Sequence, residues 1–260
     1  MSKSKGLEDT VVAITGGCGD IGQATALRLL SEGAAVVLID RAPSDAIASD
    51  SKTNAHVSYV ACDVTDRSAV ESAISEIVRA HGKLDVLIAN AGMVANEAFL
   101  DLTASNLWKT MEVNFFGAFH AAQVAARQML KQPLSERGVR GKILFTGSWV
   151  QDAPWPEGTA YIASKAALKM MAKVMAQELA TYGIRVNVLA PGIVMAGLTR
   201  RIYAANPAVR DRVAQASPLN DMHTAKSVAD GDAVLCSCDS DYMTGASLLI
   251  DGGASLVKRS

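Results

Sequence analysis

Short runs of apolar residues alternate along the chain with longer stretches in which apolar residues recur at helical spacing. Seven runs predict buried strands, at residues 11–15, 35–40, 57–61, 84–89, 142–146, 185–189 and 247–250. Five stretches predict helices, at residues 21–31, 67–80, 106–129, 160–180 and, less regularly, 207–236. Strands that are apolar throughout are typical of a parallel sheet with helices on both faces. The alternation therefore predicts an α/β fold built on a doubly wound, seven-stranded parallel sheet.

No Ser/Gly-rich linker, charge block or internal repeat divides this pattern, so we expect a single domain over residues 1–260. The least regular stretch, residues 191–224, follows a predicted strand and is interrupted by glycines and prolines. Ligands of an open parallel sheet bind beyond the carboxyl ends of its strands. We therefore predict that residues 191–224 form a substrate-binding lid.

The composition of the chain argues against two classes of partner, nucleic acids and membranes. The chain has 25 Lys and Arg against 26 Asp and Glu, with no basic stripe, which argues against nucleic acid as a partner. No apolar run reaches the roughly 20 residues that a bilayer requires, so we expect no membrane partner. The polar N-terminus has no signal core, and the four scattered cysteines predict neither a disulfide framework nor a metal site. We expect a cytoplasmic protein.

A glycine-rich loop follows the first predicted strand. Residues 16–22 read GGCGDIG, with glycines at positions 16, 17, 19 and 22, and a helix is predicted directly afterwards. Glycine lets the backbone approach a pyrophosphate, and a helix N-terminus offers N–H groups and a favourable dipole to an anion. The loop therefore indicates a dinucleotide site, although a tight turn alone would also account for it.

The second predicted strand ends in Asp40, eighteen residues after Gly22. A carboxylate at this place accepts hydrogen bonds from the adenosine ribose and repels a 2′-phosphate, which favours NAD over NADP. Arg41 tempers that preference, since it is able to reach a phosphate. The alternative interpretation is that Asp40 only caps the turn that follows.

Candidate acid–base chemistry lies at the start of a long predicted helix. Tyr161 and Lys165 are four residues apart and so share one helical face. A lysine cation lowers the pKa of a nearby phenol, which makes it a proton acceptor for an alcohol or a donor to a carbonyl. Ser148 follows the fifth predicted strand, where its hydroxyl is placed to orient the substrate oxygen.

These motifs, in this order, resemble the short-chain dehydrogenase/reductase family, whose fold is of the Rossmann type. The resemblance runs from Val11 to Gly253. It rests on the glycine loop, Asp40, Asp63-Val64, Asn90-Ala91-Gly92, Asn114, Ser148, Tyr161, Lys165 and Pro191-Gly192. The resemblance implies that Tyr161 is the general acid/base and that Lys165 holds the nicotinamide ribose. It further implies that Ser148 orients the reacting oxygen and that Asn114 holds a water of a proton relay.

The resemblance also implies a cofactor site. Its residues would be Gly16, Gly19, Asp20, Ile21, Gly22, Asp40, Arg41, Asp63, Val64, Asn90, Ala91, Gly92, Tyr161, Lys165, Pro191, Gly192 and Ile193. Two positions depart from the family pattern. Asp20 replaces the middle glycine of the loop, and we expect its carboxylate to point away from the pyrophosphate. Ala196 replaces a threonine that contacts the nicotinamide carboxamide in relatives, so that contact is lost or is replaced by Thr199.

Five residues are candidates for the substrate pocket. Met93, Trp149 and Trp155 are expected to form its wall, although the two tryptophans could instead pack at a subunit contact. Arg200 and Arg201 are expected to bind an anionic substrate, and the alternative is that both are solvated. Similar proteins associate through the helix that carries the tyrosine and its neighbour, which implies a homotetramer or a homodimer.

Together these features predict an NAD(H)-dependent oxidoreductase that interconverts a secondary alcohol and a ketone. One alternative is a 3-oxoacyl-ACP or CoA-type ketoreductase, for which Asp40 is awkward because such enzymes usually prefer NADPH. Another is a non-catalytic NAD-binding sensor, which would not need the Asn114, Ser148, Tyr161 and Lys165 set. The glycine spacing also admits an epimerase, although the chain lacks that branch's further C-terminal region.

Overall fold

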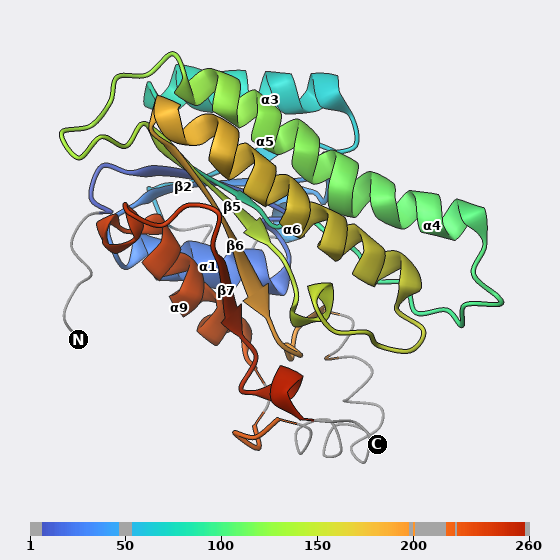
Figure 1. The fold of residues 1–260 in the computed structure, drawn as a ribbon. Coiled ribbons are helices and arrows are strands. Elements are labelled where there is room, and N and C mark those ends of the chain that lie inside the picture. Colours follow the sequence, from blue (N-terminus) through green and yellow to red (C-terminus); the bar gives the residue numbers. More distant parts are fainter. Residues whose placement is uncertain (1–6, 47–53, 198–199, 201–216, 222, 258–260) are drawn as a thin grey trace.

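A seven-stranded, all-parallel sheet forms the centre of the molecule, with strand order β3-β2-β1-β4-β5-β6-β7 (Figure 1). The computed structural model describes residues 7–46, 54–197, 200, 217–221 and 223–257. Its strands are β1 (Val11–Thr15), β2 (Ala35–Asp40), β3 (Val57–Ala61), β4 (Val86–Ala89), β5 (Gly141–Thr146), β6 (Ile184–Pro191) and β7 (Ser247–Ile250). This arrangement confirms the predicted α/β fold with a doubly wound sheet.

Helices cover both faces of the sheet (Figure 1). They are α1 (Asp20–Leu30), α3 (Arg67–His81), α4 (Ala104–Met111), α5 (Ala118–Met129), α6 (Thr159–Leu179) and α9 (Ala225–Cys236). Helices α1 and α9 lie on one face, whereas α3, α5 and α6 lie on the other. Within the part of the chain described here, none of the helices has the length and apolarity needed to cross a membrane.

Alternation along each strand divides the apolar residues between two cores. On β1, Val12 and Ile14 pack with α1 and α9, whereas Val11 and Ala13 pack on the opposite face with α3, α5 and α6. Successive side chains of a strand point to opposite faces, so a strand covered on both sides must be apolar at every position. All five residues of β1 are buried, which explains the continuous apolar run in the sequence.

Several elements differ from their predicted bounds by one or two residues, and two predicted helices differ by more. The helix predicted at residues 207–236 is wrong for residues 217–221, which form turns, and α9 begins only at Ala225, after the Thr224 side chain caps it.

Strand β4 begins at Val86 instead of residue 84, because the backbone groups of Leu84 bond to the Gln132 side chain. The Leu84 N–H donates to Gln132 Oε1 at 2.9 Å, and the Leu84 carbonyl accepts from Gln132 Nε2 at 3.0 Å. The helix predicted at residues 106–129 is interrupted by a π-helical turn, Glu112–Gly117, between α4 and α5. Such turns are frequent at functional sites, and this one contains Asn114.

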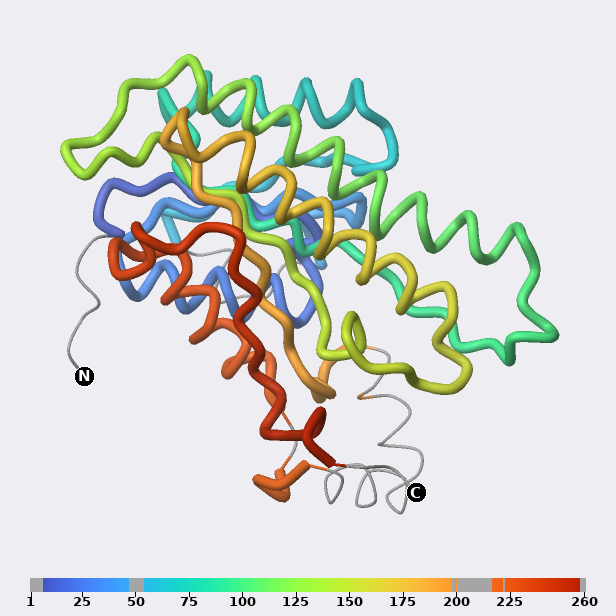
Figure 2. The backbone as a smooth tube through the Cα atoms, viewed as in Figure 1, coloured from blue at the N-terminus to red at the C-terminus, as the bar shows by residue number. Residues whose placement is uncertain are grey.

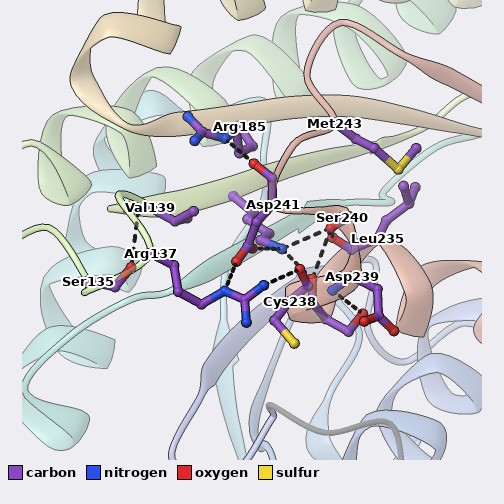
Figure 3. A network of polar contacts seen from close by, with 12 residues as sticks. Ser135, Arg137, Val139, Arg185, Leu235, Cys238, Asp239, Ser240, Asp241 and Met243 are labelled. Carbon is purple, nitrogen blue, oxygen red and sulfur yellow. Dashed lines mark hydrogen bonds and ion pairs between the residues drawn. The ribbon is translucent and has the colours of Figure 1, made fainter.

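A polar network holds the loop between α9 and β7 against the amino ends of the strands (Figure 3). The buried Lys142 ammonium on β5 donates to the Ser237 carbonyl, to the Ser240 hydroxyl at 2.9 Å, and pairs with Asp241 at 2.9 Å. Arg137 pairs with the same carboxylate at 2.6 Å. Because a buried ammonium must be fully hydrogen-bonded, these contacts fix where β7 joins the sheet. The network lies at the edge of the sheet opposite to the carboxyl ends.

Between α1 and α9 lies a buried carboxyl group. Asp232 is 1% exposed; its Oδ2 accepts a hydrogen bond from the Thr25 hydroxyl at 2.8 Å, and its Oδ1 has no partner among the described residues. Burial raises the pKa of Asp232 from 3.8 to about 7, with the Thr25 hydrogen bond opposing the shift. The protein therefore holds this side chain as a neutral acid well above the pH at which the unfolded chain would ionise it.

This burial predicts that the Asp232 contribution to stability falls as pH rises. Between pH 3.8 and about 7 the folded state keeps a proton that the unfolded state has lost, so the free energy of unfolding decreases with pH. The difference in pKa corresponds to at most about 4 kcal/mol. In urea denaturation at pH 5 and pH 8, Asp232→Asn should lose less stability between the two pH values than the parent protein.

Asp230→Asn, on the same helix, is the matched control. Burial raises the pKa of Asp230, but the ion pairs with Arg28 and Lys226 outweigh it and lower that pKa below 3.8. Asp230 is therefore ionised in both the folded and the unfolded state between pH 5 and pH 8, and Asp230→Asn should lose as much stability between the two pH values as the parent protein. Unfolding free energies for Asp232→Asn that run parallel to those of the parent protein would contradict the buried-acid interpretation.

Candidate active site

A cleft of about 740 Å³ lies at the carboxyl ends of the strands. Most of the predicted site residues line it, namely Gly16, Gly19, Asp20, Ile21, Asp40, Arg41, Asp63, Val64, Asn90, Ala91, Gly92, Met93, Ser148, Trp149, Trp155, Tyr161, Lys165, Pro191, Gly192 and Ile193. Gly22 and Asn114 are not among the lining residues, and Arg201 lies outside the described residues. Asp40 and Tyr161 thus line one and the same cleft.

The glycine loop occupies the middle of the cleft. Gly16 has φ +65°, and a Cβ there would lie 2.8 Å from the Ala91 Cα. A Cβ on Gly22 would lie 2.6 Å from the Gly16 carbonyl oxygen, so this glycine serves packing inside the loop. Helix α1 begins directly after Gly19, which provides no side-chain cap. The first N–H groups of α1 therefore face this part of the cleft without a capping side chain, as an anion site requires.

Asp40 links the end of β2 to the glycine loop. Its carboxylate accepts the backbone N–H of Cys18 at 2.9 Å and that of Ala42 at 3.0 Å. The Ala42 contact is the turn-capping bond that was the alternative interpretation. A carboxylate has about four acceptor sites, so two backbone bonds do not preclude a ribose contact. The Tyr59 hydroxyl donates to the carbonyls of Asp40, at 3.0 Å, and Ala42, which holds this turn in place.

Asp63 lines the same cleft as Asp40 and Arg41. Its Oδ1 accepts hydrogen bonds from the N–H and the hydroxyl of Thr65, at 2.9 and 2.8 Å. These bonds, with a smaller effect from the nearby Arg41 guanidinium, hold the pKa of the Asp63 carboxyl below its ordinary value. Arg41 is exposed, and its guanidinium lies close enough to Asp63 to favour the ionised carboxyl.

Asn90 cross-links the ends of three strands. Its side-chain amide donates to the carbonyls of Thr15 and Gly16 at 3.1 and 3.2 Å, and its Oδ1 accepts from the Thr146 hydroxyl at 3.3 Å. The Thr15 hydroxyl in turn accepts the N–H groups of Asn90 and Ala91, at 3.0 and 3.1 Å. Asn90 therefore ties β1, β4 and β5 together beneath the cleft. Sequence reasoning gives neither threonine a role at the site: Thr15 is only the residue before the glycine loop, and Thr146 carries no signal beyond its position at a strand end.

Asn114, on the π-helical turn, organises the wall behind the candidate catalytic residues. Its amide donates to the Met93 carbonyl at 2.9 Å and to the Ser164 hydroxyl at 3.0 Å, while its Oδ1 accepts the Met93 N–H at 2.8 Å. Gly117 ends the turn, and a Cβ there would lie 2.6 Å from the Val64 Cγ2. The wider turn and the missing side chain let this helix approach the cleft closely.

Tyr161 and Lys165 lie together on the first turns of α6, with the Lys165 ammonium 5.7 Å from the centre of the phenol ring. Lys165 is buried and donates to the Thr146 carbonyl at 2.7 Å. Burial lowers the pKa of its ammonium to about 8. Ser148, at the end of β5, is buried and forms a hydrogen bond with the phenol.

The pKa of the Tyr161 phenol is raised above its ordinary value by burial, with the Ser148 hydrogen bond acting in the opposite direction. This direction is opposite to the expected lowering by Lys165. The physical reason is that both groups are withdrawn from water, which penalises the phenolate and the ammonium alike. Among the described residues, burial therefore outweighs the attraction between the two charged forms.

The half of the cleft beside Tyr161 is walled by apolar side chains. Trp149 and Trp155 form an edge-to-face pair with ring centroids 5.6 Å apart. Met93, Val94, Val150 and Ile162 also line this half, and the sequence analysis missed Val150 and Ile162, which look like ordinary core positions. Apart from Lys165, the charged lining residues of the described chain are Asp20 at the start of α1, Asp40 and Arg41 at the end of β2, and Asp63 after β3.

Part of the predicted lid is described. The Met195 N–H donates to the His223 carbonyl at 2.7 Å, and Leu219 donates to Gly252 at 3.2 Å, so residues 217–221 lie beside the C-terminal segment (Figure 2). Residues 198–199, 201–216 and 222, including Thr199 and Arg201, lie outside the described residues, so the lid stays a prediction. Arg200 is exposed and pairs with Asp20 at 2.9 Å. Within the described ranges, no group of three or more His, Cys, Asp or Glu side chains is placed to hold a metal ion.

Comparisons with known proteins agree with this geometry. The family model described as short chain dehydrogenase matches residues 10–207. Short-chain dehydrogenase reductase 3a of Arabidopsis thaliana is 38% identical over 97% of both chains, and (+)-borneol dehydrogenase 1 of Salvia officinalis is 31% identical over 98% of this chain and 96% of its own. The crystal structure of NAD⁺-bound xylitol dehydrogenase, 31% identical, superposes with a TM-score of 0.86 over 95% of this chain and 99% of its own.

Proposed function

The chain belongs to the short-chain dehydrogenase/reductase family, and from this premise we propose that it is an NAD(H)-dependent oxidoreductase that interconverts a secondary alcohol and a ketone. The observation that carries the proposal is one cleft that joins the glycine loop and Asp40 to Ser148, Tyr161 and Lys165. A protein that only binds a dinucleotide has no need of the second group. The small-molecule partner in this proposal is the alcohol or the ketone.

The described residues fit a nicotinamide dinucleotide. The uncapped N-terminus of α1 suits a pyrophosphate, and the Asp40 carboxylate suits the adenosine ribose hydroxyls. Lys165 would hold the nicotinamide ribose, and Pro191, Gly192 and Ile193 would flank the nicotinamide. When bound, the nicotinamide supplies the hydride acceptor or donor of the reaction.

The chain's own residues handle the proton and the substrate oxygen. In alcohol oxidation Tyr161 accepts the hydroxyl proton, and in ketone reduction it donates a proton to the carbonyl oxygen. Ser148 orients that oxygen, since its hydroxyl already bonds the phenol. The raised pKa of the phenol keeps Tyr161 protonated near neutrality, which suits the donor role. Asn114 would hold the water that connects Lys165 to solvent.

The pocket beside Tyr161 supports a neutral substrate. Trp149 and Trp155 offer aromatic surface to a carbon skeleton, and the wall formed by Met93, Val94 and Val150 is apolar. Recruitment of an anion by Arg200 gains no support, because its guanidinium is paired with Asp20. We therefore propose a neutral secondary alcohol whose apolar part contacts the tryptophans.

We also propose self-association, as a homotetramer or a homodimer, in a reducing cytoplasm. Four apolar side chains on two neighbouring helices are exposed, Leu107 and Trp108 on α4 and Met170 and Val174 on α6, and we propose that they form one apolar patch. Contiguous exposed apolar surface marks protein–protein contacts in soluble proteins. The four free cysteines are in keeping with a reducing compartment.

Tyr161→Phe tests the proposed acid/base. The variant should bind NADH nearly as the parent protein does, while kcat falls about a thousandfold or more because the phenol proton is gone. Turnover on a panel of neutral secondary alcohols with NAD, and NADH titration by fluorescence, are the measurements. Tyr182→Phe, at an exposed tyrosine, is the control. Activity above a few per cent in Tyr161→Phe would assign the proton transfer to another group.

Asp40→Asn tests the cofactor preference. The Cys18 N–H bonds to Oδ2 and the Ala42 N–H to Oδ1, so the single oxygen of the amide retains one of these two bonds, while the charge that repels a 2′-phosphate is removed. The ratio of kcat/KM for NAD to that for NADP should fall about tenfold or more, which corresponds to about 1.4 kcal/mol. Asp40→Ala should relax the preference equally while also losing the two backbone bonds. An unchanged ratio in both variants would mean that Asp40 does not contact the ribose.

Met170→Glu tests the apolar patch. Light scattering coupled to size exclusion should give a multiple of 27.3 kDa for the parent protein and a smaller species for the variant, because a carboxylate would be desolvated at the contact. Leu134→Glu, at an exposed apolar residue outside the patch, should not change the mass. A monomeric parent protein would contradict the proposal.

A further inference from the structure

Asp20 occupies a position where the family pattern has glycine, and the structure shows where its carboxylate goes. Asp20 is the first residue of α1, directly after the uncapped Gly19, and it lines the cleft. Gly197, beyond the end of β6, lines the same cleft from the other side. Strands β1 and β6 are separated in the sheet by β4 and β5, so these two residues face each other across the crevice.

The Asp20 carboxylate bonds both sides of this opening together. Its Oδ2 accepts the backbone N–H of Gly197 at 2.7 Å, and the Arg200 Nη2 lies 3.0 Å from Oδ1 and 2.9 Å from Oδ2. Hydrogen bonds to an ionised acceptor are stronger than those between neutral groups. The carboxylate therefore joins the phosphate loop to the segment after β6 by two charge-assisted contacts.

The segment after β6 has a separate anchor on its far side. Val194 forms a parallel bridge with His223, and the Met195 N–H donates to the His223 carbonyl at 2.7 Å. This anchor holds the segment to the start of α9, away from the glycine loop. The hydrogen bond from the Gly197 N–H to the Asp20 carboxylate therefore holds the cleft-lining backbone of residues 193–197 toward α1.

The charges explain why a carboxylate is tolerated beside an anion site. An acidic side chain in the first turn stabilises a helix, but it would also repel a pyrophosphate bound at the same N-terminus. Pairing with the Arg200 guanidinium compensates the charge of Asp20. The Arg200 guanidinium, which lies 180 residues further along the chain, is the group toward which the Asp20 carboxylate points. It gives a physical reason for the prediction that this carboxylate points away from the pyrophosphate.

We propose that Asp20, Gly197 and Arg200 form a clasp that closes the cofactor cleft over the pyrophosphate, and that this clasp sets how long the dinucleotide stays bound. Asp20 is a positioning residue in this role, because it acts through the segment that it holds. The inference rests on the proposed function, since it requires a bound nicotinamide dinucleotide.

The test is the dissociation rate of NADH from Asp20→Asn, Arg200→Gln and the double variant. Stopped-flow fluorescence with excess NAD as competitor gives the rate, and NADPH with NADP replaces the pair if that form is the one that binds. Each single substitution should raise the rate about threefold to fivefold, as expected for an exposed ion pair worth up to about 1 kcal/mol. The double variant should match the faster single variant, because either change opens the same clasp.

Salt and stability measurements separate the clasp from a purely structural role. Added salt should speed NADH release from the parent protein more than from the variants, because the exposed ion pair is screened. Melting temperatures should fall by no more than about 2–4 °C, the shift that a loss of about 1 kcal/mol gives in a domain of this size. Glu71→Gln, which removes an exposed carboxylate paired with Arg67 outside the cleft, should leave the release rate unaltered.

The outcomes are distinct. Unchanged release rates in the single variants, or effects that multiply in the double variant, overturn the clasp while leaving the proposed function intact. Failure of the parent protein to bind either dinucleotide overturns the proposed function itself.

Discussion

Every strand of the sheet runs in the same direction, so seven carboxyl ends meet at one edge, and this constraint places all the candidate chemistry. Residues at the ends of β1, β2, β4, β5 and β6 reach the same cleft although they are spread over most of the chain. The opposite edge serves another purpose. There Lys142 and Asp241 hold the last strand in place, far from the cleft.

Below the cleft, the strand ends are held by side-chain hydrogen bonds that the sheet itself does not provide. Asn90 and Thr15 satisfy each other's backbone groups where β1 and β4 diverge, and Asn114 does the same for Met93. Buried polar groups of this kind are costly unless every donor and acceptor is paired. Their pairing gives the cleft a rigid floor on which Ser148, Tyr161 and Lys165 keep their relative positions.

Burial also determines the electrostatics of the site. It lowers the pKa of Lys165 to about 8 and raises that of Tyr161, so the isolated protein favours a protonated phenol. The same effect acts on Asp232 between α1 and α9, where it keeps a carboxyl group neutral. None of these three groups forms an ion pair among the described residues, whereas the half-buried Asp20 at the cleft is paired with the Arg200 guanidinium.

Local pattern determined much of this protein without any coordinates. The apolar runs predicted the strands, and the combination of the glycine loop, Asp40, Ser148 and the Tyr161–Lys165 spacing predicted the cleft, because each signal is contained in a few neighbouring residues. Tertiary structure alone decided the π-helical turn at Asn114, the direction of the Tyr161 pKa and the bond between Asp20 and Gly197, which are 177 residues apart. The physical reason is that burial and pairing depend on which distant segments meet, and periodicity along the chain carries no information about that.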